Sequence, residues 1–91
     1  MEMIEATIRV YGLVQGVGFR YFVFRNAEIL GVNGYTKNNL DSSVVSILEG
    51  EATKVNQLLK LIKQGPSRGR VDHFDVAFSE FNNKFKRFDI L

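Results

Sequence analysis

A short glycine-rich stretch, Val14-Gln15-Gly16-Val17-Gly18-Phe19-Arg20, separates two different spacings of hydrophobic residues. Before it, apolar and polar residues alternate over residues 4–11, which predicts a β-strand with one buried face. After it, apolar residues recur every three or four positions, which predicts a helix over about residues 20–30. Gly31 follows the last of them, where glycine easily adopts a left-handed helix cap. The stretch is therefore a strand-to-helix connection, and the rest of the fold has to be built around one β–α unit.

Further patterns complete the set of elements. Asn and Asp residues within 38–42 indicate a turn, because their side chains bond nearby main-chain groups, and the strand-like residues on both sides predict a hairpin. The sequence does not show which face of the second arm is buried, because each of the pairs Val44-Val45 and Ile47-Leu48 places an apolar residue on either face. The two hairpin arms are predicted at residues 32–37 and 43–49. A second helix is predicted at residues 52–64, where Gly65-Pro66 ends it. A fourth strand is predicted at residues 73–78 and a short closing edge strand at residues 87–90.

The resulting order is strand, helix, strand, strand, helix, strand, with a short last strand. This is the split βαβ plan of the ferredoxin-like α/β sandwich, in the α+β class. It predicts an antiparallel sheet with both helices on one face. A chain of 91 residues has room for one such core, so we expect a single domain over residues 1–91. Because RNA-binding modules, metal-binding domains, regulatory domains and enzymes share this plan, the fold alone does not give the function.

Composition narrows the chemistry. The chain has no Cys and one His, which excludes disulfides and thiol catalysis and argues against a structural zinc site. The acidic residues form no recognisable metal cluster. A net charge of +2 without a run of Lys or Arg gives no nucleic-acid tail. No apolar segment approaches the roughly 18 residues that span a membrane, and the start shows no signal-peptide pattern, so we expect a cytoplasmic protein without a membrane partner.

The glycine-rich stretch has the residues of an anion-binding loop. Gly16 and Gly18 can reach positive φ and let the main chain approach a ligand, so that successive amides turn inward as a nest. The helix that follows adds its positive end, and Arg20 offers a planar fork of donors that matches phosphate oxygens. The stretch matches neither the Walker pattern nor the dinucleotide fingerprint. A glycine-rich turn with a solvated arginine remains the alternative on this pattern alone.

Three other features have both a functional and a plain structural interpretation. Asn38, at the end of the second strand, can fix the place of a water molecule, but it is also a typical turn residue. His73 could act as a base, but it fits the outward face of the fourth strand, and nothing near it in the sequence suggests a partner. Residues 16–24 faintly echo the glycine and aromatic signature of the RNA-recognition motif, yet their helical spacing puts these aromatics in the wrong element.

Taken together, these segments resemble the signatures of the acylphosphatase family, and the resemblance covers nearly the whole chain. It is carried by Tyr11-Gly12-Leu13-Val14-Gln15-Gly16-Val17-Gly18-Phe19-Arg20, by Gly34-Tyr35-Thr36-Lys37-Asn38 followed by Asp41, Val44 and Glu49-Gly50, and by Gln64-Gly65-Pro66 and Phe88-Asp89-Ile90. Two signatures at the expected separation are much more specific than either alone.

The resemblance implies an enzyme that hydrolyses acyl phosphates to a carboxylate and inorganic phosphate, without metal or cofactor. It implies two catalytic residues, Arg20, which binds the phosphate, and Asn38, which positions the attacking water. The amides that would cradle the phosphate are those of Gln15, Gly16, Val17, Gly18, Phe19 and Arg20.

A site that has only main-chain amides, an arginine and an asparagine suits the implied reaction. An acyl phosphate leaves as a carboxylate, which is a stable anion, so no general acid is needed. The barrier is then mostly orientation and the stabilisation of charge on the phosphoryl oxygens. Because the motif contains no base, we hypothesise that the proton of the water passes to the substrate phosphate itself.

Two residues depart from the family pattern. Ser42 stands in the turn after Asn38 where the family usually has glycine, which puts the turn type in doubt, because glycine would ease a positive φ there. Ser46 stands in the third strand where an apolar residue is commoner. Neither position is a predicted site residue.

Two rivals to a free-standing enzyme remain. The same motif occurs, by resemblance, at the start of larger carbamoyl-transferring proteins, although a chain that starts at Met1 and ends soon after Ile90 favours a free-standing enzyme. We expect this enzyme to be a monomer. The other rival is a non-catalytic module that binds RNA or a phosphorylated ligand through the same nest. The modest net charge counts against RNA.

Overall fold

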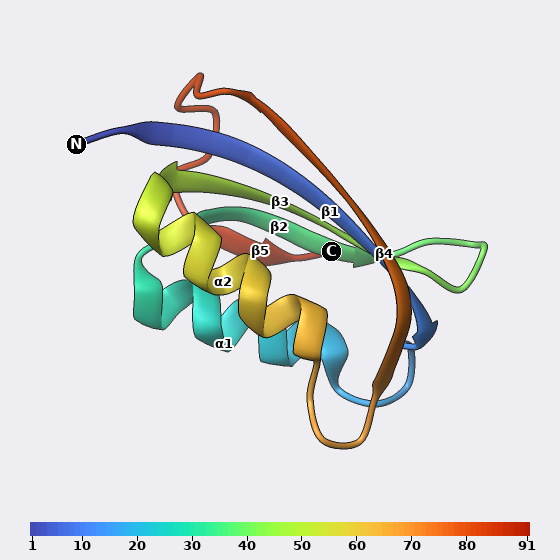
Figure 1. Ribbon diagram of the computed structural model, residues 1–91. Coiled ribbons are helices and arrows are strands. Elements are labelled where there is room, and N and C mark those ends of the chain that lie inside the picture. Colours follow the sequence, from blue (N-terminus) through green and yellow to red (C-terminus); the bar gives the residue numbers. More distant parts are fainter.

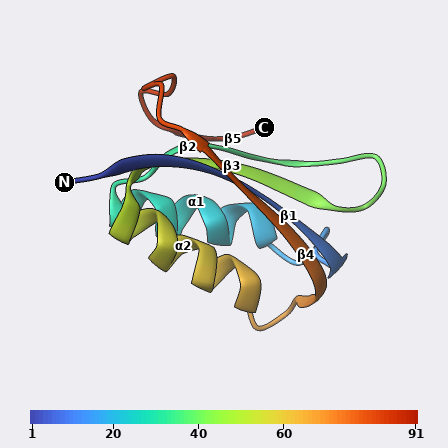
Figure 2. The same ribbon diagram turned by 45° about the horizontal axis from the view of Figure 1, so that its top comes forward.

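The computed structural model describes residues 1–91 and forms two layers, a sheet of five strands and a pair of helices (Figure 1). The elements are β1 (Met3–Leu13), α1 (Phe19–Leu30), β2 (Asn33–Asn38), β3 (Val44–Glu51), α2 (Ala52–Gln64), β4 (Arg70–Glu80) and β5 (Phe88–Ile90). Both helices cover the same face of the sheet (Figure 2). The predicted order and the two-layer, ferredoxin-like plan are confirmed, and β4 is longer than predicted at both ends. Neither helix has the length and apolarity that a membrane crossing requires.

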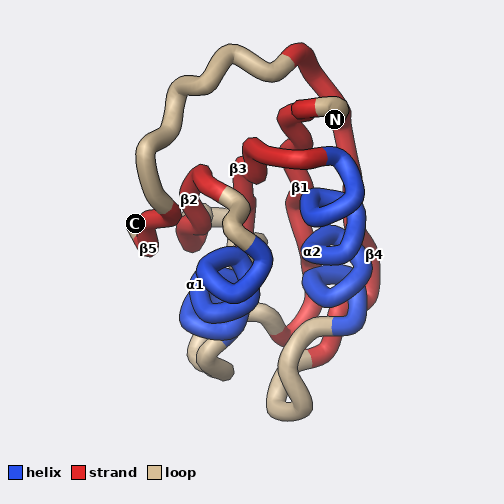
Figure 3. The backbone as a smooth tube through the Cα atoms, turned by 90° about the vertical axis from the view of Figure 1, so that its left-hand side faces the viewer, coloured by secondary structure: helices blue, strands red, loops and turns tan.

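The strands lie in the order β4-β1-β3-β2-β5. β1 pairs antiparallel with β3 and with β4, and β2 pairs antiparallel with β3. β5 pairs parallel with β2, so the prediction of a wholly antiparallel sheet is wrong and the sheet is mixed. The cause lies in the path of the chain. β4 and β5 occupy opposite edges, and residues 81–87 cross from one edge to the other at the end where β4 stops (Figure 3). A strand that starts there must run opposite to β4, which is the direction of β2.

The core lies between the sheet and the helices. The predicted stripes are buried: Phe19, Val23 and Ala27 on α1, and Val55, Leu58, Leu59 and Ile62 on α2. They pack against Ala6, Ile8 and Val10 of β1 and against Val44 and Leu48 of β3. Full burial of an aliphatic or aromatic side chain contributes about 1.5–3 kcal/mol, so this layer holds the site's supporting elements in place.

The outer face of the sheet is polar but not wholly exposed. Alternation along β1 put Glu5 on the solvent side, yet Glu5 is 6% exposed and its cross-strand partner Glu49 is 2% exposed. Residues 81–87 cover them. Glu49 accepts hydrogen bonds from the main-chain N–H groups of Asn82 and Phe85, at 3.3 and 3.2 Å, and Lys84 Nζ lies 3.1 Å from Glu5 Oε1. The Glu5 and Glu49 carboxylates therefore fix residues 81–87, the segment that leads into β5.

β3 resolves the open question about its faces. Val44, Ser46 and Leu48 lie on the face toward the helices, where Val44 and Leu48 join the core, and Val45 on the other face is also buried in this central strand between β1 and β2. The buried hydroxyl of Ser46 donates to Thr36 Oγ1 of β2 at 2.8 Å, which satisfies a group that would otherwise be costly to bury. The cross-strand register puts Thr36 directly opposite Ser46. This pair explains how a polar residue fits where an apolar one is commoner.

Candidate active site

The glycine-rich stretch forms the predicted turn between β1 and α1. Gly16 and Gly18 have φ of 76° and 78°, and a Cβ on either would meet no atom within 4 Å. Backbone conformation, rather than lack of space, therefore favours glycine at both positions. Val14 and Phe19 at the two ends of the turn are buried in the core, whereas Gly16 and Gly18 are exposed. The turn is anchored at its ends and presents its main chain to solvent between them.

The turn carries a group of free donors. The main-chain N–H groups of Gly16, Val17 and Gly18 make no hydrogen bond within the protein. α1 begins at Phe19, and the N–H groups of a first helical turn have no acceptor within their own helix. Together with the positive end of the helix dipole, these donors favour an anion at this point. The turn thus leaves main-chain donors available to an anion, and its role as an anion-binding loop stays a prediction.

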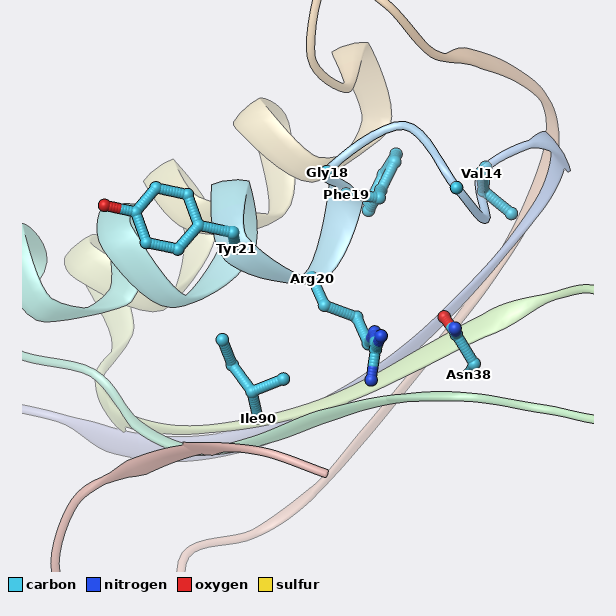
Figure 4. Close-up of a pocket in the computed structure, with 8 residues that line it drawn as sticks. Val14, Gly18, Phe19, Arg20, Tyr21, Asn38 and Ile90 are labelled. Carbon is cyan, nitrogen blue, oxygen red and sulfur yellow. The ribbon is translucent and has the colours of Figure 1, made fainter.

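A cavity of about 220 Å³ opens beside this turn. It is lined by Val14, Gly16, Gly18, Phe19, Arg20, Tyr21, Asn38 and Ile90. Arg20 is the second residue of α1 and Asn38 is the last of β2, and their polar ends lie on neighbouring sides of the cavity (Figure 4). Nη1 of Arg20 donates to the main-chain oxygen of Leu91 at 2.7 Å, which holds the guanidinium between α1 and β5. The fold brings the two residues that the sequence singled out into one cavity.

Gln15 links the two halves of the site through its side chain. Its Nε2 donates to the main-chain oxygens of Asn39 and Ser43, at 2.9 and 3.0 Å. Both acceptors belong to the β2–β3 turn that begins directly after Asn38. The sequence predicted a main-chain role for Gln15, and the structure adds this contact between side chain and turn. A polar residue inside the loop was the only sequence signal for it.

The β2–β3 turn carries a network of hydrogen bonds of its own. The N–H of Asn39 donates to Ser43 O at 2.9 Å, and its Nδ2 donates to Ser43 Oγ at 3.1 Å. Asp41 accepts from the Ser43 hydroxyl and from its main-chain N–H. These bonds from Ser43, the side-chain one first, hold the pKa of Asp41 below its usual value, so its carboxylate stays charged. Ser42 has φ of 75°, which is the conformation that glycine would adopt more easily.

The other candidates lie away from the cavity. His73 is on β4, with its side chain 65% exposed, and its Nε2 lies 3.2 Å from Asp75 Oδ1. It faces Tyr11 on the outer side of the sheet, with the two ring centroids 5.4 Å apart, as the structural interpretation predicted. The side chain of Val17 packs against the core instead of lining the cavity. No group of three or more His, Cys, Asp or Glu side chains is placed to hold a metal ion.

Sequence reasoning did not identify two lining residues, Tyr21 and Ile90. Tyr21 follows Arg20 on α1, and Ile90 comes from β5 at the opposite sheet edge from β4. The position of Ile90 depends on the parallel pairing of β5 with β2, which the sequence did not predict.

Fold and cavity together define a class of protein. It is a small ferredoxin-like α/β sandwich in which a glycine-rich loop, an arginine and an asparagine face one small cavity that suits an anion. A family model described as Acylphosphatase matches residues 6–90. The chain belongs to the acylphosphatase family.

Comparisons with individual proteins agree with this assignment. An acylphosphatase of Lactobacillus gasseri is 42% identical over 90 residues, which cover 98% of this chain and 99% of that protein. The crystal structure of acylphosphatase from Bacillus subtilis superposes with a TM-score of 0.92 at 33% identity, covering 97% of this chain and 98% of that one. Full-length HypF in its phosphate- and nucleotide-bound form matches with a TM-score of 0.89 at 33% identity, covering 99% of this chain and 12% of HypF.

Proposed function

We propose that this protein hydrolyses acyl phosphates at the cavity between the β1–α1 turn, Arg20 and Asn38. Membership of the acylphosphatase family assigns the reaction class. The observation that carries the assignment to residues is the convergence of free loop amides, one guanidinium and one amide side chain on a single cavity. The volume of about 220 Å³ lies below the roughly 300–1,000 Å³ of sites for drug-sized ligands, as suits a phosphoryl group.

In the proposed reaction, the loop amides and Arg20 bind the phosphoryl oxygens. Asn38 holds a water molecule through its amide, in line with the bond to the leaving oxygen. The oxygen of the water forms a new bond to phosphorus, and the bond between phosphorus and the acyl oxygen breaks with its electron pair on the carboxylate. Stabilisation of charge by preorganised donors and the placement of the nucleophile supply most of the catalysis.

The proton of the water is proposed to pass to a phosphoryl oxygen. An acyl phosphate dianion and water then give a carboxylate and dihydrogen phosphate, H2PO4⁻, which releases one proton to solvent to become HPO4²⁻. His73, the only imidazole, lies on the outer face of the sheet and is proposed to take no part. A marked fall in rate in His73→Ala, with the fold intact, would contradict this part of the mechanism.

The test combines turnover with phosphate binding. We expect the purified protein to hydrolyse acetyl phosphate equally with and without EDTA, because no metal or cofactor is proposed. Asn38→Ala should lose turnover by about 100-fold or more while still binding inorganic phosphate, and Arg20→Ala should lose both. Arg25→Ala, an exposed arginine one turn along the same helix, and Asn56→Ala on α2 are the matched controls and should retain both. Normal turnover in Arg20→Ala would refute the assignment.

We further propose that residues 1–91 act as one catalytic unit, as a cytoplasmic monomer without a nucleic-acid partner. The residues that line the cavity come from the β1–α1 turn, α1, β2 and β5, so the site draws on elements from both ends of the chain, which supports residues 1–91 as one catalytic unit. One segment of HypF resembles this chain, so the alternative is that residues 1–91 form part of a larger protein. Light scattering of the purified chain measures whether it is a monomer. Acetyl phosphate turnover by the chain alone measures whether residues 1–91 are sufficient for catalysis.

A further inference from the structure

The loop between α2 and β4, residues 65–69, packs directly against the β1–α1 turn. The two connections lie at the same end of the molecule (Figure 1). A Cβ on Gly69 would lie 3.0 Å from the main-chain oxygen of Leu13, the last residue before the turn, and 3.2 Å from Cγ2 of Val17 in its middle. The α2–β4 loop therefore contacts the turn where the turn begins and again at its centre.

The same loop also contacts the residue at which the turn ends. A Cβ on Gly65 would lie 3.1 Å from Cε2 of Phe19 and 3.3 Å from Cγ2 of Val71. Phe19 is the first residue of α1 and is 2% exposed. The N–H of Gly65 donates to Leu61 O at 2.9 Å, which fixes this contact to the end of α2. One loop thus supports the β1–α1 turn along its whole length.

Close approach, rather than backbone conformation, favours glycine at position 69. Gly69 is not among the glycines with positive φ, in contrast to Gly16 and Gly18. Its N–H donates to Pro66 O at 3.0 Å, which closes the loop into a turn of its own. Because the loop is fixed in this way, a side chain at position 69 would have to push Leu13 and Val17 aside.

Val17 transmits this contact to the free donors. Its side chain packs against the core, while its N–H and those of Gly16 and Gly18 make no hydrogen bond within the protein. Both flanking glycines are exposed and have no side chain that could hold them. A displacement of the Val17 side chain therefore displaces the amides on either side of it.

We infer that the α2–β4 loop, through Gly69 above all, positions the free main-chain amides of the β1–α1 turn for the phosphoryl group. This inference rests on the proposed function, since it assigns a support to the amides that are proposed there to bind phosphate. Gln15 ties the same turn to the β2–β3 turn beside Asn38. The two supports therefore act on different parts of the reaction, Gln15 on the place of the water and Gly69 on the place of the phosphoryl group.

Gly69→Ala adds one methyl group at the contact, which its neighbours can admit only by moving a few tenths of an ångström. Because a misplacement of 1 Å can cost about 100-fold, we expect the inhibition constant of inorganic phosphate and the KM of acetyl phosphate each to rise about three- to tenfold. The kcat should stay within about threefold. Binding that is lost equally from the ground state and the transition state raises KM and leaves kcat unchanged.

Two control variants separate positioning from stability. Gly31→Ala lies at the other end of α1, where φ is 71° and an added Cβ would meet no atom within 4 Å. It strains the backbone and should lower the midpoint of urea unfolding, yet leave the phosphate inhibition constant and KM unchanged. Ser67→Ala, at an exposed position of the α2–β4 loop itself, should change none of these quantities.

A measurement on the wild type tests the same contact without any substitution. In a titration with inorganic phosphate followed by ¹⁵N NMR, the amide signals of Gly16 and Gly18 should shift, and those of Gly65 and Gly69 should shift with them. The signal of Gly31 should stay in place. This titration decides the question if Gly69→Ala does not fold.

The outcomes distinguish this inference from the proposed function. If the wild type binds phosphate and hydrolyses acetyl phosphate, but Gly69→Ala keeps the wild-type inhibition constant, the support by the α2–β4 loop is wrong and the proposed function stands. The same conclusion follows if phosphate shifts the signals of Gly16 and Gly18 but neither Gly65 nor Gly69. If the wild type neither binds phosphate nor hydrolyses acetyl phosphate, the proposed function itself fails, and this inference fails with it.

Discussion

Replacing Ser42 with glycine should stabilise the protein. Ser42 has φ of 75°, one of two non-glycine residues in the chain with positive φ. Its side chain is exposed and makes no hydrogen bond, so the substitution removes no contact from the folded state. The main-chain bond from Ser42 N to Asn39 O, at 3.2 Å, is available to glycine as well. The change therefore acts almost purely through backbone conformation.

Two opposing terms set the magnitude. A left-handed conformation costs a residue with a Cβ roughly 1–2 kcal/mol, which glycine avoids. Glycine in turn loses about 0.5–1 kcal/mol more conformational free energy on folding. The difference is a gain of about 0.5–1 kcal/mol in the free energy of unfolding. For a domain of this size that corresponds to a rise in Tm of about 2–8 °C.

Thermal and urea unfolding followed by circular dichroism measure both quantities. Ser67→Gly is the matched control, because Ser67 is also exposed in a loop but does not have positive φ, and glycine there should destabilise by about 0.5–1 kcal/mol. If Ser42→Gly destabilises the protein as much as Ser67→Gly does, the account of this turn is refuted. The same variant should leave the turnover of acetyl phosphate within twofold, because Asn38 stays on β2.

Three further predictions concern the supports of the site. Gln15→Ala should lower kcat by about tenfold with little change in phosphate affinity, because the turn after Asn38 loses two hydrogen bonds; an unchanged kcat would show that the link plays no part. Glu49→Gln should destabilise the protein by about 1–3 kcal/mol in urea unfolding, since a buried carboxylate that accepts two main-chain bonds is replaced by an amide with one acceptor oxygen. The folded pKa of Asp41 is lowered, so its bonds from Ser43 stabilise the protein above the ordinary pKa of 3.8, and this contribution disappears as pH falls through the lower folded value. The difference in the free energy of unfolding between wild type and Asp41→Asn should therefore be largest near neutral pH and disappear in acid. A difference that does not change with pH would contradict this prediction.

Much of the fold follows from the sequence because its hydrophobic periods are clear. The alternation over residues 4–11 and the helical stripes on α1 and α2 gave elements whose buried faces the structure confirms. The direction of β5 did not follow, because it depends on which sheet edge the last strand joins after residues 81–87 cross the sheet. The burial of Glu5 and Glu49 did not follow either, since a local pattern cannot show that a later loop will cover them.

The site, like the fold, could be predicted only in part from the sequence. Gly16, Gly18, Arg20 and Asn38 could be named from the sequence, because their chemistry and their positions at element ends are local properties. Their convergence on one cavity depends on the packing of α1 against β2, which the family resemblance implied and the structure shows. The side-chain role of Gln15 and the placement of Ile90 depend on contacts between segments 24 or more residues apart, which local patterns in the sequence do not specify.

The most direct test of the mechanism follows the oxygen of the water. With acetyl phosphate in water enriched in ¹⁸O, we predict that the enzyme-dependent product carries the label in inorganic phosphate, seen as an isotope shift in ³¹P NMR, and that acetate stays unlabelled. The rate of labelling should fall in Asn38→Ala in parallel with turnover. Label in acetate would mean that water attacks the carbonyl carbon, and it would contradict a site in which Arg20 and the loop hold the phosphoryl group for an attacking water held by Asn38.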